Sequence, residues 1–338
     1  MLSVVIPVYK TPRYALERCL NSVLSFQGDV EVICVLDSPG DACGDVLTAF
    51  AQREKRMRLF VNETNQGVSF TRNRGMDYAQ GDVLTFVDAD DEIEPATYEQ
   101  ALKFMLVRNL DMCVCMSPNG GSWRGVEVGE FIETSFPSAE GEKLTAIVSA
   151  LGQSCWGALW KRKTLVDRNI RFSVGLKWNE DFLFSTHLIN SGGRFGWLNK
   201  DGYHRIGCEE SVTKQSMTPQ LTLDKLDAQC MMLPLLQIEA LPVSLRAWYA
   251  RNFLGNVFGN RHVAKLFPKE IRHDFDERLT TFLKMFVEKG LLSLCTLPTQ
   301  LLLCRLRHHP TRLIDNYWTM ALPMAALLKY KKLVRHMP

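Results

Sequence analysis

The sequence predicts an α/β protein with a mostly parallel, Rossmann-like sheet flanked by helices. Four short apolar runs, each typical of a strand buried on both faces, alternate with amphipathic segments over the first 92 residues. This alternation favours a parallel sheet with right-handed crossovers. The carboxyl ends of such strands share one edge, so the polar turns that follow them are expected to face one crevice, where ligands bind.

The expected elements follow in order along the chain. The strands are Leu2–Val8, Val30–Leu36, Met57–Val61 and Asp82–Val87. The helices between them are Thr11–Ser25, Val46–Arg53 and Ser69–Ala79. Farther along, residues 156–162 resemble a strand, and helices are expected over residues 164–169 and 182–190.

The fourth strand ends in three carboxylates packed into four residues, Asp88, Asp90 and Asp91. Carboxylates this close repel one another, so a divalent cation or a set of backbone amides is expected to join them. Asp and Glu are also ordinary turn and capping residues, and Glu94-Pro95 is typical of a helix start. Taken alone, the cluster leaves a ligand site and a plain turn as alternatives.

Other turns carry side chains suited to a nucleotide. Tyr9, just beyond Pro7, offers a face on which a planar base could stack, with a buried strand-end aromatic as the alternative. Asp37 can accept an N–H group of a base, or it can simply form the turn. Arg72 and Arg74 lie two residues apart, so one of them is expected to point into the crevice and grip a diphosphate. A solvated arginine is the alternative.

A second pair of acids, Glu180 and Asp181, opens the strongly apolar helix over residues 182–190. Two acids at a helix amino terminus fit the helix dipole, so capping is one interpretation. Trp156 and Trp178 could stack on sugar faces or could pack in the core.

Taken in order, these motifs resemble the family 2 glycosyltransferases, inverting enzymes with the A-type nucleotide-sugar fold. The resemblance covers residues 1 to about 215, and its matching segments are Ser3–Tyr9, Asp37, Asn65–Gly67 with Thr71–Gly75, Asp88–Asp90 and Trp178–Asp181. One feature departs from the family pattern. Similar sequences usually carry paired acids followed by Gly-Ser-Thr after the second strand, whereas here Leu36 precedes Asp37 and Ser38-Pro39-Gly40 follows. Contact between Asp37 and the base is still expected, and the identity of the base is left open.

The resemblance implies transfer of a sugar from a nucleotide diphosphate donor, UDP-linked by preference, to a glycan or lipid-linked glycan acceptor of a bacterial surface polysaccharide. Asp181 would be the general base, with Glu180 orienting it or contacting the acceptor. Asp90 and Asp88 would hold Mn²⁺ or Mg²⁺ against the diphosphate. The expected nucleotide-binding residues are Pro7, Val8, Tyr9, Asp37, Asn65, Gly67, Arg72, Asp88 and Ala89. Trp156 and Trp178 would contact the acceptor, and His204, Arg205 and Lys214 the phosphates.

Two other functions compete with this one: a sugar nucleotidylyltransferase on a related sheet, and a non-catalytic protein that binds nucleotide sugars. The Gly-rich, Arg- and Lys-containing signature of the former is absent after the first strand. A dehydrogenase ranks lower, because no Gly-x-Gly-x-x-Gly follows that strand. The ten cysteines contain no Cys-x-x-Cys pair and the seven histidines show no ligand spacing, so the sequence shows no competing metal site.

The 338 residues, 46% of them hydrophobic, can bury a sizeable core. We expect a catalytic domain over residues 1–216 and a helical carboxyl-terminal region over residues 217–338. The first strand begins almost at Met1 without a signal peptide, and cysteines such as Cys34 and Cys113 fall inside expected strands. Both observations favour the cytoplasm.

Positive charge gathers at the carboxyl terminus. Residues 290–338 carry seven Lys or Arg against the single acid Asp315, a net charge of +6, whereas the whole chain carries +3. No apolar run there reaches the length of a membrane span. Basic and apolar residues together favour attachment to the inner face of the cell membrane, with a packed helical subdomain or a homodimer contact as equal alternatives. Nucleic acid is not an expected partner.

Overall fold

The computed structural model describes residues 1–118, 120–137, 141–208, 218–236, 238–264 and 268–295. Lys214 and the basic segment from residue 296 onward lie outside the described residues, so the structure does not address their predicted roles. The chain divides into two compact units. We call Met1–Ser216 with Leu235–Leu245 the sheet unit, and Met217–Pro234 with Arg246–Pro338 the helical unit.

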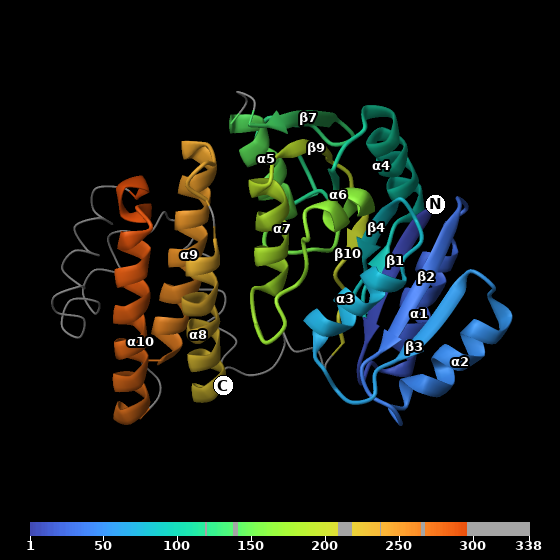
Figure 1. The fold of residues 1–338 in the computed structure, drawn as a ribbon, viewed down its shortest axis with the longest axis horizontal. Helices are drawn as coiled ribbons and strands as arrows, with labels where there is room; N and C mark the ends of the chain where they lie inside the picture. Colours follow the sequence, from blue (N-terminus) through green and yellow to red (C-terminus); the bar gives the residue numbers. More distant parts are fainter. Residues whose placement is uncertain (119, 138–140, 209–217, 237, 265–267, 296–338) are drawn as a thin grey trace. The chain divides into compact units, whose positions relative to one another are not determined.

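The sheet unit is built on one eight-stranded sheet in the order β3-β2-β1-β4-β8-β6-β9-β7 (Figure 1). Its first half is parallel: β1 (Leu2–Val8) pairs with β2 (Val30–Leu36) and β4 (Val83–Phe86), and β2 pairs with β3 (Met57–Val61). These four strands match the sequence prediction, and every residue of β2 is buried, as expected of a strand covered on both faces.

The second half of the sheet is mixed. β8 (Ala158–Lys161) runs antiparallel to β4 and to β6 (Met112–Cys115), while β9 (Gly193–Leu198) is parallel to β6 and antiparallel to β7 (Phe131–Phe136). A separate two-stranded sheet joins β5 (Glu92–Ile93) to β10 (Tyr203–His204). The predicted fold class, a mostly parallel sheet flanked by helices, is confirmed.

Seven helices of the sheet unit are described: α1 (Arg13–Leu24), α2 (Cys43–Arg53), α3 (Val68–Tyr78), α4 (Pro95–Arg108), α5 (Gly141–Leu151), α6 (Arg162–Asp167) and α7 (Glu180–Asn190). Helix α2 begins three residues before its predicted start at Val46. At this start, Asp41 Oδ1 accepts a hydrogen bond of 2.9 Å from the backbone N–H of Cys43, the first residue of the helix.

Helix α3 packs directly on β1. At Gly75 an added Cβ would lie 2.3 Å from Val5 Cγ1, so only glycine permits this approach. Arg72, three residues earlier on α3, is thereby brought against the carboxyl edge of the sheet. Beneath it lies an aromatic group in which the Phe172 and Phe184 rings stack at 4.1 Å and Phe86 meets both edge-on.

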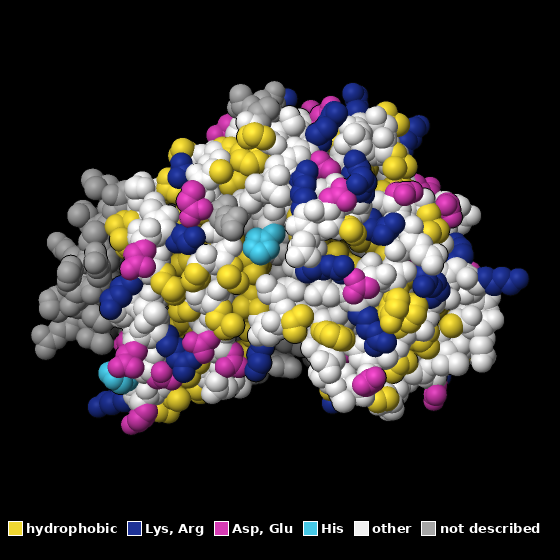
Figure 2. All heavy atoms as spheres, viewed as in Figure 1, with side chains coloured by type: hydrophobic (Ala, Val, Ile, Leu, Met, Phe, Trp, Pro, Cys, Tyr) yellow, Lys and Arg dark blue, Asp and Glu magenta, His cyan; other side chains and the backbone are white. Residues whose placement is uncertain are grey.

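The described part of the helical unit contains α8 (Pro219–Leu235), α9 (Val243–Ala264), α10 (Lys269–Glu288) and the 3₁₀ helix η2 (Leu291–Leu294). Among the residues described, no helix combines the length and the apolar character needed to cross a membrane. On the face shown in Figure 2, cationic and anionic side chains are interspersed over the sheet unit.

Candidate active site

The carboxyl ends of β1, β2, β3 and β4 lie at one edge of the sheet, as their parallel pairing requires (Figure 1). The predicted polar residues follow these ends. Tyr9 comes after β1, Asp37 after β2, Asn62 after β3 and Asp88 after β4. The structure therefore brings these side chains to a common edge, where the sequence places a ligand crevice.

Asp37 is 4% exposed and holds the turn at residues 65–67. Its Oδ1 accepts hydrogen bonds from Asn62 Nδ2 at 2.7 Å and from the Gln66 backbone N–H at 2.9 Å. Its Oδ2 accepts one from the Gly67 N–H at 2.8 Å. Gly67 has φ +84°, which glycine adopts without strain, and Asn65 is exposed on the same turn.

Tyr9 is 44% exposed, so the alternative of a buried strand-end aromatic does not hold. The Lys10 ammonium lies 5.1 Å from the centre of the Tyr9 ring, and the Lys10 backbone N–H donates to Asp41 Oδ2 at 2.7 Å. Pro7 and Val8 pair with β2 and support the start of this turn. The turn thus presents an accessible aromatic face at the crevice.

Arg72 is the centre of the site. Its guanidinium is 3% exposed and contacts three carboxylates. Nη2 donates to Asp88 Oδ1 at 2.9 Å, and Nη1 donates to Asp181 Oδ1 at 2.5 Å and to Glu180 Oε1 at 3.3 Å. One buried cation therefore joins the acid cluster after β4 to the acid pair that opens α7. The contact that the sequence predicts between Arg72 and a diphosphate stays a prediction.

Burial in this cluster makes the acid pair unusually basic. Loss of hydration and the neighbouring Asp181 raise the pKa of Glu180 to about 7, although Arg72 opposes the rise. Burial likewise raises the pKa of Asp181, and Arg72 partly offsets it. With three carboxylates and one guanidinium, the cluster carries more negative than positive charge when fully ionised. A carboxylate poised in this way can take up a proton near neutral pH.

Cys155 is a further member of the site that the sequence did not reveal. It lies beside Asp181, and its side chain and backbone act against the rise in the pKa of the Asp181 carboxyl. The side chain is fully buried, and the Cys155 carbonyl accepts the Trp160 indole N–H at 3.0 Å. The loop between α5 and β8 thus contributes a residue next to Asp181 that no motif in the sequence pointed to.

Asp91 is held by backbone amides, one of the two arrangements expected for the acid cluster. Its carboxylate accepts hydrogen bonds from the N–H groups of Ile206 at 2.9 Å and Gly207 at 3.0 Å, and from the Tyr203 hydroxyl at 2.9 Å. The same hydroxyl accepts the Asp88 backbone N–H at 3.1 Å. Tyr203 of β10 and the segment that follows it thus hold the Asp88–Asp91 turn together.

Asp88 and Asp90 fit a hard divalent cation only in part. Oδ1 of Asp88 is engaged by Arg72, and Oδ2 of Asp90 accepts the Cys208 thiol at 3.6 Å. Within the described residues, no group of three or more His, Cys, Asp or Glu side chains could hold a metal. Mg²⁺ and Mn²⁺ are commonly held by one or two carboxylates with phosphate oxygens and water. The two aspartates fit a cation of that kind, which a bound diphosphate would complete.

The remaining predicted residues lie around the same edge. The Trp156 ring stacks on Tyr203 with centroids 4.7 Å apart, and the Arg205 guanidinium lies 5.5 Å from the Trp156 ring. His204 is exposed and pairs with Glu92 in the small sheet. Trp178 is half-buried just before the acid pair.

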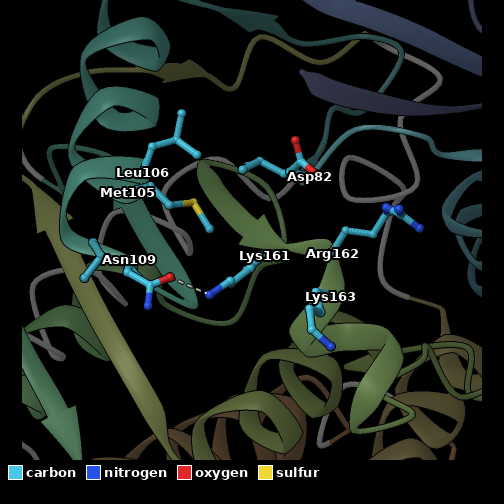
Figure 3. Close-up of a pocket in the computed structure, with 9 residues that line it drawn as sticks. Asp82, Met105, Leu106, Asn109, Lys161, Arg162 and Lys163 are labelled. Carbon is cyan, nitrogen blue, oxygen red and sulfur yellow. Dashed lines mark hydrogen bonds between the residues drawn. The ribbon is translucent and has the colours of Figure 1, made fainter.

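A cavity of about 210 Å³ lies elsewhere (Figure 3). It sits where β4 begins and β8 ends, at the edge opposite the crevice, and its lining includes Asp82, Met105 and Lys161. Lys161 Nζ donates to Asn109 Oδ1 at 2.7 Å there. The cavity therefore takes no part in the site.

Removal of the Tyr203 hydroxyl tests the tie between the two segments. Tyr203→Phe leaves the Asp88 N–H without its acceptor and Asp91 with one donor fewer, while the ring can still stack on Trp156. We expect UDP affinity in Mn²⁺, measured by calorimetry, to fall by about 10-fold, in line with the loss of a buried hydrogen bond to a charged group. The control variant Tyr249→Phe, in the helical unit, should leave UDP affinity unchanged. Equal affinities in wild type and Tyr203→Phe would contradict this role.

The raised pKa of Glu180 predicts a pH-dependent stability. The folded chain holds a proton at Glu180 up to about pH 7, whereas an unfolded Glu titrates near 4.5. Its contribution to stability is therefore complete below about pH 4.5 and is lost as the pH rises through about 7. Glu180→Gln does not titrate. The unfolding temperature of the variant minus that of wild type should therefore increase by roughly 5 °C between pH 5 and pH 8.

Glu54→Gln is the control for this titration. Its partner Arg56 lowers the pKa of Glu54 to about 2, so both its folded and its unfolded transitions lie below pH 5. The difference in unfolding temperature between Glu54→Gln and wild type should change little above pH 6. If the difference in unfolding temperature between Glu180→Gln and wild type is also constant between pH 5 and 8, Glu180 is ionised over this whole range and the prediction is wrong.

Comparison with known proteins identifies the domain. Residues 3–154 match the family model described as Glycosyl transferase family 2. The uncharacterized glycosyltransferase YibD of Escherichia coli is 27% identical over 196 residues, which are 54% of this chain and 56% of that protein. The minor teichoic acid biosynthesis protein GgaB of Bacillus subtilis is 25% identical over 209 residues, or 60% of this chain and 22% of that protein.

Thus the chain spans about half the length of the Escherichia coli relative. The crystal structure of S. aureus TarS 1-349 in complex with UDP-GlcNAc superimposes with a TM-score of 0.70 and 22% identity, over 98% of this chain and 91% of that one. This likeness shows the shared fold. The match over residues 3–154, somewhat under half of the chain, confirms the resemblance found in the motifs: these residues match a glycosyltransferase domain of family 2.

Proposed function

We propose that this chain is an inverting glycosyltransferase that moves a sugar from a UDP-linked donor to a glycan acceptor. The observation that carries the proposal is the bridge made by Arg72 between Asp88 of the donor-side motif and Asp181 of the acid pair. The bridge puts a potential base next to the edge where a donor diphosphate would bind. The family 2 domain and a structural relative that binds UDP-GlcNAc support the donor class.

Asp181 is the general base in this proposal. The acceptor hydroxyl oxygen attacks the anomeric carbon opposite the diphosphate, and its proton passes to the Asp181 carboxylate. The bond from the anomeric carbon to the phosphate oxygen breaks, and its electron pair leaves with the nucleotide diphosphate. Arg72 and Cys155 hold the carboxylate in place, and burial keeps it basic enough to accept the proton.

Asp88 and Asp90 would hold the divalent cation, whose charge would stabilise the departing diphosphate. A structural relative of 14% identity, a mannosyltransferase of Pyrobaculum calidifontis, is described in complex with GDP-Man and Mn²⁺. Tyr9 would stack on the base and Asp37 would accept its N–H group. Arg205 and His204 would contact the phosphates, and Trp156 and Trp178 would stack on the acceptor sugar.

The name of one relative supports an acceptor class. One of them is named for minor teichoic acid biosynthesis, which supports a glycan or lipid-linked glycan of a bacterial surface polymer as the acceptor. We also propose a cytoplasmic enzyme that works at the inner face of the cell membrane. The basic segment that would attach it, or form a homodimer, lies outside the described residues.

Asp90→Ala tests the cation site. If Asp90 binds a cation that in turn binds the donor diphosphate, the substitution should weaken UDP binding about 10-fold or more in Mn²⁺ and hardly change it in chelator. Asp82→Ala, at the opposite edge of the sheet, should change neither value. An equal loss of UDP affinity with Mn²⁺ and with chelator would make Asp90 structural.

Asp181→Asn separates an enzyme from a binding protein. The amide keeps the shape of the side chain but cannot take a proton, so transfer from UDP-GlcNAc to a glycan acceptor should fall by about 10²- to 10⁴-fold. UDP affinity and the unfolding temperature should stay close to wild type. Asp77→Asn, a partly exposed partner of Arg171, is the matched control. Undiminished transfer in Asp181→Asn would shift the role of base to Glu180.

A further inference from the structure

Arg74, unlike Arg72, does not contact the acid cluster. Its Nη1 donates to the side-chain oxygen of Asn62 at 2.6 Å and to the Val61 carbonyl at 2.8 Å. Its Nε donates to the Tyr78 hydroxyl at 3.2 Å. The Tyr78 ring in turn stacks on Phe60 of β3 at 3.7 Å. The guanidinium is thus fixed between α3 and the end of β3.

Asn62 passes this constraint on to Asp37. The Asn62 side chain is 1% exposed, and its Nδ2 donates to Asp37 Oδ1 at 2.7 Å and to Thr71 Oγ1 at 3.1 Å. Both N–H groups and the oxygen of the amide are therefore used. Arginine only donates and a carboxylate only accepts, so the oxygen must face Arg74 and the nitrogen must face Asp37. Arg74 consequently decides which way the amide points.

The direction of the amide matters for Asp37. With Asn62 Nδ2, Gln66 N–H and Gly67 N–H bound, Asp37 uses three of about four acceptor positions, and the fourth is on Oδ2. Without Arg74 the buried Asn62 oxygen would lack its donor, and a flipped amide would set this oxygen against the Asp37 carboxylate. Either change would cost free energy and displace Asp37.

We propose that Arg74 is a positioning residue that sets nucleobase selectivity by holding Asn62 and, through it, Asp37. The inference rests on the proposed function, in which Asp37 faces the base. A carboxylate held as an acceptor favours a base that presents a ring N–H, as uracil does at N3. It disfavours cytosine, whose N3 presents a lone pair. The two bases have nearly the same size, so hydrogen bonding decides between them.

The test compares UDP and CDP affinities of the full chain by calorimetry in Mn²⁺. Wild type should bind UDP more tightly than CDP. In Arg74→Leu, UDP affinity should fall about 10-fold while CDP affinity changes by less than about 3-fold, because one hydrogen bond to a charged group is lost only with UDP. Arg74→Lys keeps a cationic donor and should retain most of the preference, which also covers the case in which Arg74→Leu does not fold.

Asn62→Leu shows whether Arg74 acts through the amide. This variant should lose the same preference, and the double variant with Arg74→Leu should lose no more, since both changes remove one chain of contacts. Arg58→Leu is the matched control. Arg58 lies on β3 and, like Arg74, contacts Tyr78; it donates to the Tyr78 backbone carbonyl at 2.8 Å, but it pairs with Glu31 rather than with Asn62. It should keep the wild-type ratio of affinities.

Three results would overturn the inference, and they differ in what they leave standing. If Arg74→Leu weakens UDP and CDP equally, or changes neither, Arg74 is structural and the proposed function is unaffected. If the double variant loses much more preference than Arg74→Leu alone, Arg74 does not act through Asn62. If wild type binds neither nucleotide, or does not prefer UDP, the UDP-linked donor of the proposed function fails together with the inference.

Discussion

One buried guanidinium determines how this site is arranged. Arg72 donates to Asp88, Glu180 and Asp181, which come from the end of β4 and the start of α7. Each carboxylate would be costly to bury alone, and removal of the shared cation would leave like charges facing one another. The donor-side motif and the acid pair therefore depend on the same side chain for their placement.

Other contacts hold Arg72 and the acids in position. Gly75 lets α3 lie against β1, which sets the height of Arg72 above the sheet, and the stacked Phe172 and Phe184 form the floor. Asn73 and Phe172 exchange two hydrogen bonds of 2.9 Å, side chain to backbone, and so attach the loop before α7 to α3. Catalytic geometry of this kind needs a rigid support, because small displacements of a base cost much of the rate.

Much of the fold was accessible from the sequence, because its strands are uninterrupted apolar runs and its turns are polar. The order of the motifs also singled out Asp88, Glu180 and Asp181, which the structure brings together around Arg72. The sequence could not show that β8 inserts antiparallel between β4 and β6, nor that Arg72 meets acids more than 100 residues away. Cys155 and the Tyr203 hydroxyl were missed because their roles depend on tertiary contacts. Asn62 did carry a signal, since it directly follows a strand at the crevice edge.

A double-mutant cycle between Asp88 and Asp181 measures the central claim most directly. No direct hydrogen bond between these residues is found in the described structure; both bind Arg72. If Arg72 couples them, the change in unfolding free energy of the double variant Asp88→Asn with Asp181→Asn should differ from the sum of the two single changes, of which that of Asp181→Asn is small, by more than about 0.5 kcal/mol. Additivity within about 0.3 kcal/mol would contradict the account, because it would mean that the two acids are placed independently.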